Sequence, residues 1–391
     1  MHRRHLLATA ATVVFGFATT GAFAADTVKI GFILPMTGQQ QTTGQETAAA
    51  IKLYQQQHGD TVAGKKIEVI IKDDGAVPDA TKRIAQELIV NEKVNVLAGF
   101  GITPCALAVA PLATEAKIPQ IVTAAGTSII TEKSPYIVRT SFTLAQSTVP
   151  MADWAAQNGI KKVVSMVSDY APGIDAEASF KDEFTKKGGQ IAESIRFPLA
   201  SPDFAPFLQR AGDAKPDAIF VFVPAGQGAA FVKQFLERGL DKQGIKIIGP
   251  GDVTDDQLLN GMGDQVIGTV TAHFYSADHG SKANKDYVTG FEKISNGMRP
   301  NFMSVGGYDG MHLIYEALKK TNGDANGDKL LAAMKGLSWE SPRGPISIDP
   351  DTRDIIQNVY IRKVEKKNGE LYNVEFATFP SVKDPIKAAK K

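Results

Sequence analysis

The sequence contains very little cysteine. Only Cys105 among its 391 residues carries a thiol, so no disulfide can form within the chain and stability has to come from a buried apolar core. Cys105 lies in the apolar stretch Pro-Cys-Ala-Leu-Ala at 104–108. In such surroundings a small buried hydrophobe is expected rather than a catalytic thiol.

The sequence also lacks an excess of charge of either sign. Its 43 Lys and Arg residues are balanced by 42 Asp and Glu residues, which excludes nucleic acid as the expected partner. After residue 24 no run of about twenty apolar residues occurs, so no transmembrane helix is predicted. The length and a hydrophobic fraction of 43% are typical of a globular protein with two or three domains.

Motifs for cofactors and metals are incomplete. The segment 59–65 resembles a phosphate loop, but Lys66 replaces the hydroxyl residue that binds magnesium. Pro104 replaces the third glycine of a dinucleotide fingerprint that would begin at Gly99. No histidine pair has a metal-binding spacing, and no nucleophile elbow occurs. We therefore expect no cofactor, no metal ion and no catalytic residues.

The first residues have the pattern of a secretory signal peptide. Arg3 and Arg4 precede the apolar stretch 6–17, and small residues end the segment at Ala24. This pattern predicts export and cleavage of residues 1–24. An uncleaved membrane anchor is the alternative, and the arginine pair leaves a twin-arginine export route open beside the general one.

Beyond the signal peptide, short β-branched runs alternate with helical patterns, which predicts an α/β fold with parallel-dominated sheets. The predicted strands are 28–34, 67–72, 94–98, 119–123, 162–168, 218–223 and 246–249. The predicted helices are 43–58, 78–91, 105–116, 145–158, 173–187, 203–212, 226–239, 284–296 and 303–320.

The alternation pauses at 136–149 and again at 272–281. Two interleaved lobes are therefore predicted. The N-terminal lobe would comprise 26–140 and 275–350, and the C-terminal lobe 145–270 and 351–391.

Several segments, in this order and spacing, resemble the periplasmic solute-binding proteins of ABC transporters, of the leucine/isoleucine/valine-binding type. The segments are 29–38, 99–110, 118–127, 139–140, 168–170, 220–234 and 306–309. The resemblance implies a type I periplasmic binding fold, with two Rossmann-like lobes joined by three hinge crossovers. It also implies a monomer in the periplasm that captures a small molecule without catalysis and delivers it to a membrane-embedded ABC permease.

In this family the ligand carboxylate is held by a hydroxyl and by backbone amides where strands end and helices begin. The resemblance assigns the hydroxyl role to Thr103 and Thr127 and the amide role to Ala125. The alternative is that the threonines are ordinary helix caps.

The departures from the family pattern concern the ammonium pocket. Leu144 stands where amino-acid binders carry an acid, and Asp252 is about two positions out of register with the second acid. Phe100, Phe142 and Tyr170 are candidate aromatic walls, although Phe142 can instead belong to the lobe core. The candidate ligand-binding residues are Gln41, Phe100, Thr103, Ala125, Thr127, Phe142, Tyr170, Pro224 and Asp252.

These departures predict binding of a small hydrophobic or aromatic carboxylate without an α-amine, which points to the aromatic-acid-binding branch. The alternative is a branched-chain or other aliphatic amino acid, with Asp252 as the partner of its ammonium group. A sensor ectodomain or an amide-responsive receptor of the same fold and an exported α/β hydrolase are the alternatives from other classes.

Overall fold

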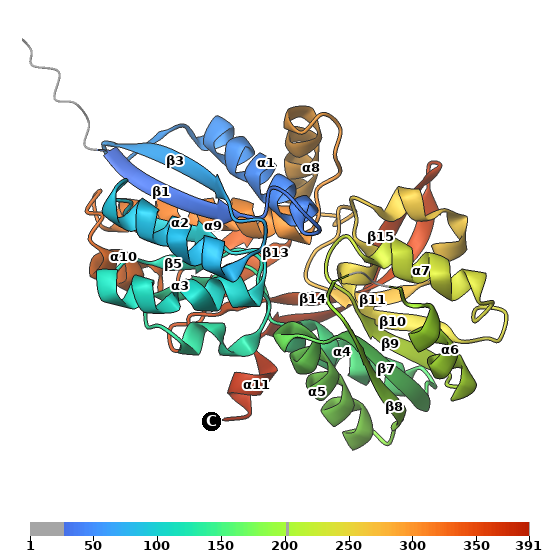
Figure 1. Ribbon diagram of the computed structural model, residues 1–391. Helices are drawn as coiled ribbons and strands as arrows, with labels where there is room; N and C mark the ends of the chain where they lie inside the picture. Colours follow the sequence, from blue (N-terminus) through green and yellow to red (C-terminus); the bar gives the residue numbers. More distant parts are fainter. Residues whose placement is uncertain (1–26, 201–202, 391) are drawn as a thin grey trace, which may run out of the picture.

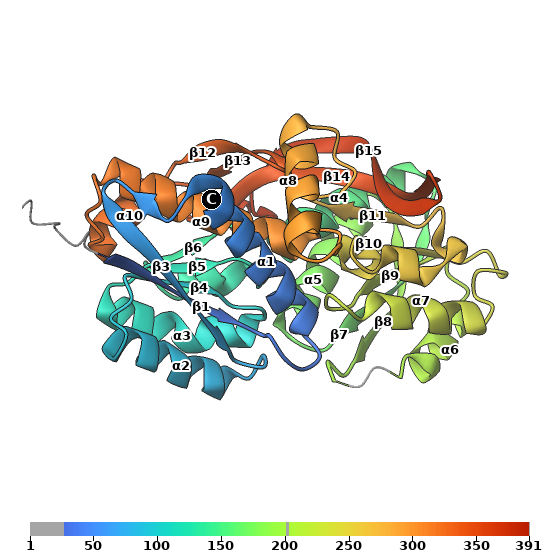
Figure 2. The ribbon, with the colours of Figure 1, turned by 90° about the horizontal axis from the view of Figure 1, so that it is seen from above.

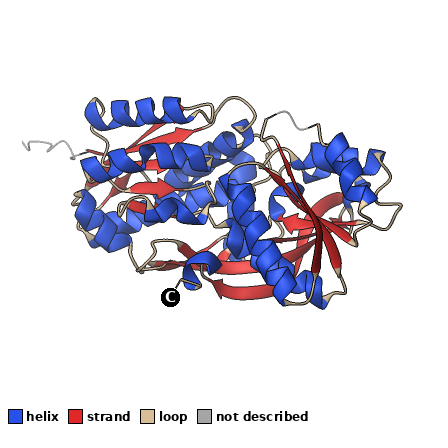
Figure 3. Cartoon of the chain, turned by 60° about the horizontal axis from the view of Figure 1, so that its bottom comes forward, coloured by secondary structure: helices blue, strands red, loops and turns tan. Residues whose placement is uncertain are grey.

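The computed structural model describes residues 27–200 and 203–390. The predicted signal peptide, 1–24, lies outside the described residues. The chain forms two lobes, each a sheet with helices on both faces (Figure 1, Figure 3). We call the part built on the six-stranded sheet the first lobe and the part built on the nine-stranded sheet the second lobe.

The sheet of the first lobe has the order β2-β3-β1-β4-β5-β6, and its strands are parallel except for the β2–β3 pair. The strands are β1 (Thr27–Leu34), β2 (Thr61–Val62), β3 (Lys65–Asp73), β4 (Val96–Gly99), β5 (Gln120–Val122) and β6 (Ile137–Arg139). Its helices are α1 (Gln41–His58), α2 (Pro78–Val90), α3 (Thr103–Ala116), α9 (Phe302–Lys320) and α10 (Gly327–Met334).

The apolar residues of strand β1 point to both faces of the sheet, and helices cover both faces. Val28, Ile30 and Phe32 pack with α1 and α9, whereas Ile33 packs with α2 and α3. Alternate residues of a strand point to opposite faces, and a parallel strand covered on both faces is apolar almost throughout.

The sheet of the second lobe has the order β12-β13-β14-β11-β10-β9-β7-β8, with β15 paired to β14. Its parallel part consists of β7 (Lys162–Ser168), β8 (Gln190–Phe197), β9 (Ala218–Phe222), β10 (Lys246–Pro250) and β11 (Val270–His273). Its antiparallel part consists of β12 (Ser338–Ser341), β13 (Gly344–Ile348), β14 (Ile355–Lys367) and β15 (Glu370–Val382).

Helices α4 and α5 pack on one face of this sheet, and α6 and α7 on the other. The helices are α4 (Leu144–Gln157), α5 (Ala171–Lys186), α6 (Ala205–Asp213) and α7 (Gly228–Glu237), with α8 (Lys282–Ile294) beside α1 and α11 (Pro385–Ala388) near the chain end. The short 3-10 helices are η1 (Ser128–Glu132), η2 (Gly251–Thr254), η3 (Leu259–Met262) and η4 (Asp264–Val266).

Every predicted strand and helix is present with ends shifted by at most two residues, and the predicted α/β class is confirmed. The long β14–β15 hairpin was not predicted. Its turn, Asn368-Gly369, has positive φ at both residues, 52° and 89°, which is the Asn-Gly signal of a tight hairpin. The charged residues of β14 interrupt the alternation of apolar and polar residues beside this turn, so the sequence pattern did not indicate the two strands.

Strand β14 joins the cores of the two lobes. Ile355 at its start packs with Ile346 and Ile348 in the first-lobe core, whereas Val359 and Ile361 pack in the second. Figure 2 shows β14 and β15 passing across the top of the molecule. The predicted lobe boundaries stay a prediction, since β12 and β13 pair with the second sheet but pack against the first core.

Arg139 and Asp354 connect two of the segments that pass between the lobes. The Arg139 Nε lies 2.9 Å from the Asp354 carboxylate, and both side chains are buried. Lys387 of α11 pairs with the same carboxylate. None of the described helices combines the length and apolar character needed to cross a membrane.

Candidate functional site

A cavity lies between the lobes, where strands of both parallel sheets end and helices begin. About 340 Å³ of it, including its open mouth, is free of atoms. The first lobe lines it with Gly101, Ile102, Thr103, Ala124, Ala125 and Gly126. The second lobe lines it with Tyr170, Pro172, Phe222, Pro224, Ala225 and Asp252. Carboxyl ends of strands are where open α/β sheets bind ligands.

Thr103 begins helix α3 on the first-lobe wall. Its buried hydroxyl lies 2.7 Å from the Thr127 hydroxyl, and the cap residue Ile102 makes no side-chain hydrogen bond to the helix. The amides of the first turn and the positive end of the helix dipole favour an anion at this point. This wall therefore fits a carboxylate.

Arg139 fixes the neighbouring loop. Its guanidinium donates hydrogen bonds to the carbonyl oxygens of Ala125 at 2.7 Å, Thr127 at 2.6 Å and Phe142 at 2.8 Å. The Ala125 amide donates to the Phe100 carbonyl at 3.1 Å. Here the structure differs from the sequence prediction, because the Ala125 amide that was assigned to the ligand has a partner within the protein.

Three predicted residues lie outside the cavity lining. Phe100 is fully buried in the core between β4, α2 and α3, and its φ of +70° turns the loop so that the ring enters that core. Gln41 is exposed at the start of α1, and its neighbour Gln40 lines the cavity instead. Thr127 contacts the site through its hydrogen bond to Thr103.

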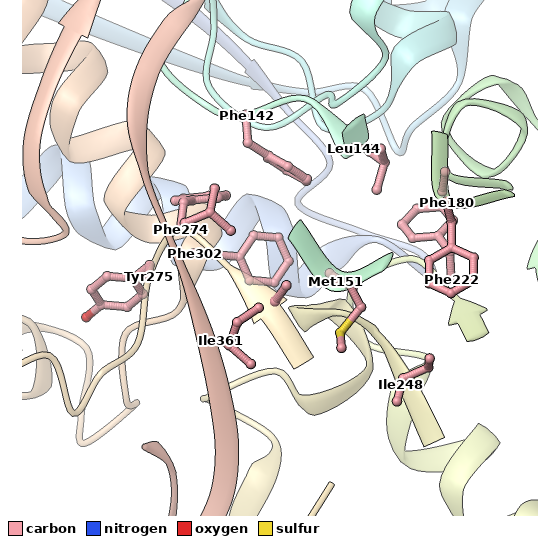
Figure 4. Close-up of a cluster of buried hydrophobic side chains, with 14 of the residues drawn as sticks. Phe142, Leu144, Met151, Phe180, Phe222, Ile248, Phe274, Tyr275, Phe302 and Ile361 are labelled. Carbon is pink, nitrogen blue, oxygen red and sulfur yellow. The ribbon is translucent and has the colours of Figure 1, made fainter. Parts of the chain in front are cut away.

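Aromatic rings form much of the remaining wall. Tyr170 and Phe222 stack with ring centroids 6.1 Å apart and planes 19° apart. Phe142 lines the cavity and also packs against Phe274 at 5.0 Å and Phe302 at 5.9 Å, so it belongs to both wall and core. Figure 4 shows the Phe142 group on one side and Phe222 on the other.

Leu144 lies between these aromatic groups in Figure 4 and lines the cavity. The sequence singled out this residue as a missing acid, and its side chain presents a methyl surface there. The sequence pattern did not single out Phe222. Phe220 and Phe222 are two residues apart, however, and this period places both rings on the face of β9 that α4 and α5 cover.

Asp252 is the one Asp or Glu among the described residues that line the cavity. It is 3% exposed, and its Oδ2 has no hydrogen-bond partner in the described part of the chain. Burial, with a further contribution from Asp255, raises its pKa to about 8. At neutral pH the side chain is therefore mainly an uncharged acid.

His273 stands directly behind Asp252 at the end of β11. Its Nε2 lies 3.9 Å from the Asp252 Oδ2 and has no hydrogen-bond partner among the described residues. Burial lowers the pKa of His273 well below its ordinary value, and Arg362 and Arg343 lower it further. The ring is fully buried, and its Nδ1 lies 3.5 Å from the Ser147 hydroxyl.

Cys105 is a free, fully buried thiol, as predicted, and burial raises its pKa to about 12. In the described residues no group of three or more His, Cys, Asp or Glu side chains is arranged to hold a metal ion.

Comparison with protein families gives a match to the periplasmic binding protein family over residues 27–370. A curated relative, the Leu/Ile/Val-binding protein homolog 6 of Brucella abortus, is 43% identical over 383 residues, which cover 97% of this chain and 98% of the relative.

Solved structures give similar matches. A solute-binding protein of an ABC transporter from Rhodopseudomonas palustris BisB5, in complex with 3,4-dihydroxybenzoic acid, is 71% identical with a TM-score of 0.91, covering 93% of this chain and 99% of that one. One from R. palustris with 4-hydroxybenzoate is 44% identical with a TM-score of 0.90, covering 94% and 100%. A leucine-binding protein of Thermotoga maritima is 25% identical with a TM-score of 0.80, covering 90% and 99%.

Proposed function

The chain belongs to the periplasmic binding protein family, and from this premise we propose that it captures a small aromatic carboxylate between its two lobes. The observation that carries the proposal is the 71% identity, over nearly the whole of both chains, to a solute-binding protein in complex with 3,4-dihydroxybenzoic acid.

The cavity supports this ligand class independently. Thr103 at the start of α3 offers a hydroxyl and a helix N-terminus to a carboxylate. Tyr170, Phe222 and Phe142 offer aromatic faces and edges to a ring.

The chemistry of the lining also disfavours an α-amino acid. A buried ammonium group requires an ionised partner, because an unpaired buried charge costs several kcal/mol. Leu144 offers no such partner, and Asp252, which burial holds mainly uncharged in the absence of a ligand, would have to ionise to provide one.

The test is a thermal-unfolding screen of the mature protein with 3,4-dihydroxybenzoate, 4-hydroxybenzoate, benzoate, leucine and valine. A ligand at a hundred times its Kd adds about 2.7 kcal/mol to the free energy of unfolding. Stabilisation by the aromatic acids alone is expected. Cyclohexanecarboxylate, which has the carboxylate without the aromatic faces, is the matched control and should stabilise less. Stabilisation by leucine or valine alone would overturn the proposal.

A branched-chain or other aliphatic amino acid is the second candidate ligand. It is favoured by the name of the Brucella relative, which is 43% identical, and by the acid at Asp252. On this alternative Asp252→Ala abolishes leucine binding, whereas an aromatic acid without an amine is still bound.

We further propose that the protein works in the periplasm as a monomer, without catalysis, and delivers its ligand to a membrane-embedded ABC permease. Family membership supports the transport role. Light scattering of the mature protein with and without ligand tests the monomer, and recovery of the ligand unchanged after prolonged incubation tests the absence of catalysis.

A further inference from the structure

We propose that Asp252, backed by His273, receives a ring hydroxyl of the bound aromatic carboxylate, and so selects hydroxylated over unsubstituted rings. This inference rests on the proposed function, because it assumes an aromatic carboxylate whose charged end lies at Thr103. Thr103 and Asp252 line the same cavity from different lobes, so one small ligand can contact both.

The first argument is the lack of partners for two buried polar atoms. Neither the Asp252 Oδ2 nor the His273 Nε2 has a hydrogen-bond partner in the described part of the chain, and the 3.9 Å between them is too long for a hydrogen bond. Buried polar atoms are nearly always paired. A group from the ligand is the natural missing partner, because Asp252 lines the cavity.

The second argument is that the pair is rigidly held. A Cβ on Gly251 would lie 2.4 Å from the His273 Cδ2, so the backbone before Asp252 packs directly on that ring. The His273 ring packs against Phe274 at 4.5 Å and Phe302 at 4.3 Å between centroids. Such packing fixes where Asp252 stands, which a specificity-determining residue requires.

The third argument concerns which ligand group fits. A hydroxyl both donates and accepts, so it can pair with Asp252 in either protonation state. An ammonium group only donates and requires an ionised Asp252. The charged and titratable groups around Asp252 are Arg362, Asp255, Tyr170 and His273. Arg362 is already paired with Asp256, and the neutral histidine adds no negative charge that would stabilise an ammonium group at this end of the cavity.

The experiment is calorimetric titration of 4-hydroxybenzoate and benzoate into the wild type, Asp252→Ala and the control Asp169→Ala. Asp169 is adjacent to Tyr170 in sequence, but its side chain is 58% exposed. We expect Asp252→Ala to weaken 4-hydroxybenzoate binding roughly tenfold or more, since a buried polar group then loses its partner. Benzoate binding should change by less than about threefold, and the control should bind both ligands as the wild type does.

Equal weakening of both ligands by Asp252→Ala would overturn the inference and assign Asp252 to the general shape of the site. A wild type that binds neither aromatic acid refutes the proposed function instead, before any variant is compared.

If Asp252→Ala does not fold, the wild type decides the question. The ¹³C NMR signal of the Asp252 carboxyl, assigned by its loss in Asp252→Asn, should shift with 4-hydroxybenzoate and not with benzoate. The same shift with both ligands contradicts the inference. For the positioning residue His273, His273→Phe should reduce the preference for 4-hydroxybenzoate over benzoate while both ligands still bind.

Discussion

The two walls of the cavity differ in how their polar groups are paired. On the first-lobe wall, the carbonyl oxygens of Ala125 and Thr127 accept hydrogen bonds from Arg139. On the second-lobe wall, Asp252 and His273 each have a buried polar atom without a partner among the described residues. The first wall is shaped by bonds within the protein, so its form does not depend on the ligand. The second wall has unused hydrogen-bonding capacity, and discrimination between ligands is expected there. The following predictions test this division.

Removing Arg139 should have the largest effect. Arg139→Met removes the guanidinium donor of three carbonyl oxygens and one of the two cations paired with Asp354. Breaking a buried pair in this way lowers the free energy of unfolding by about 3–5 kcal/mol, measured by urea denaturation. Arg196→Met is the control, because Arg196 is 44% exposed beside Glu177 and should lose less than about 1 kcal/mol. Similar losses would show that the first wall does not depend on Arg139.

Gly251→Ala should disturb the second wall. The new Cβ would lie 2.0 Å from the Arg362 Nη2 and 2.8 Å from the His273 Cβ. Overpacking of this kind costs about 1–3 kcal/mol of stability and displaces Asp252, so the preference for hydroxylated ligands should fall as well. The control is Gly261→Ala, since nothing lies within 4 Å of its Cβ position. If Gly251→Ala had the same free energy of unfolding as the wild type, the packing argument would be contradicted.

The buried acid of the second wall should make stability depend on pH. Burial raises the pKa of Asp252 from 3.8 to about 8, so the folded protein holds a proton that the unfolded chain releases near pH 4. Its contribution is present in full below that pH and is lost as pH rises towards 8. Asp252→Asn should remove this contribution to the slope and gain roughly 3–4 kcal/mol over the wild type between pH 5 and 8. Asp255, whose pKa burial raises to about 7, keeps its own contribution in both proteins. Urea denaturation at pH 5 and pH 8 measures the gain. If the stability of the wild type and of Asp252→Asn changed by the same amount between these pH values, the prediction would be contradicted.

Gly126→Ala should have the smallest effect on stability. Its Cβ would lie 2.5 Å from the Leu144 Cδ2, the flexible end of a side chain that can turn away. The free energy of unfolding should change by less than about 1 kcal/mol. Leu144 would then turn into the cavity, so ligand affinity should fall several-fold. Adding Leu144→Val, which removes a methylene, should restore affinity; no recovery would mean that the loop backbone has moved.

Much of this arrangement could be predicted from the sequence, because it depends on local patterns. The alternation of β-branched and helical segments predicted the parallel sheets, and the ends of the strands predicted which loops meet at the cavity. Thr103, Tyr170, Pro224 and Asp252 lie in those loops, and the structure places all four in the lining.

The remaining features depend on contacts between distant parts of the chain. The direction of the Phe100 ring follows from a single positive φ, and Gln40 rather than its neighbour Gln41 lines the cavity. His273 meets Asp252 only after β10 and β11 pair. No pattern within a short window of sequence reports such a contact.

The position of Arg139 has a consequence for how proteins of this kind diversify. One guanidinium holds both the loop that contains Ala125 and Thr127 and Asp354 in the segment between β13 and β14. A substitution at Arg139 therefore disturbs one wall of the cavity and a segment that passes between the lobes at the same time. The loop after β10 is tied in a similar way, because Asp256 pairs with Arg362 and accepts a hydrogen bond from the Ala277 amide. New ligand preferences are therefore expected to arise with least disturbance in the loop after β9.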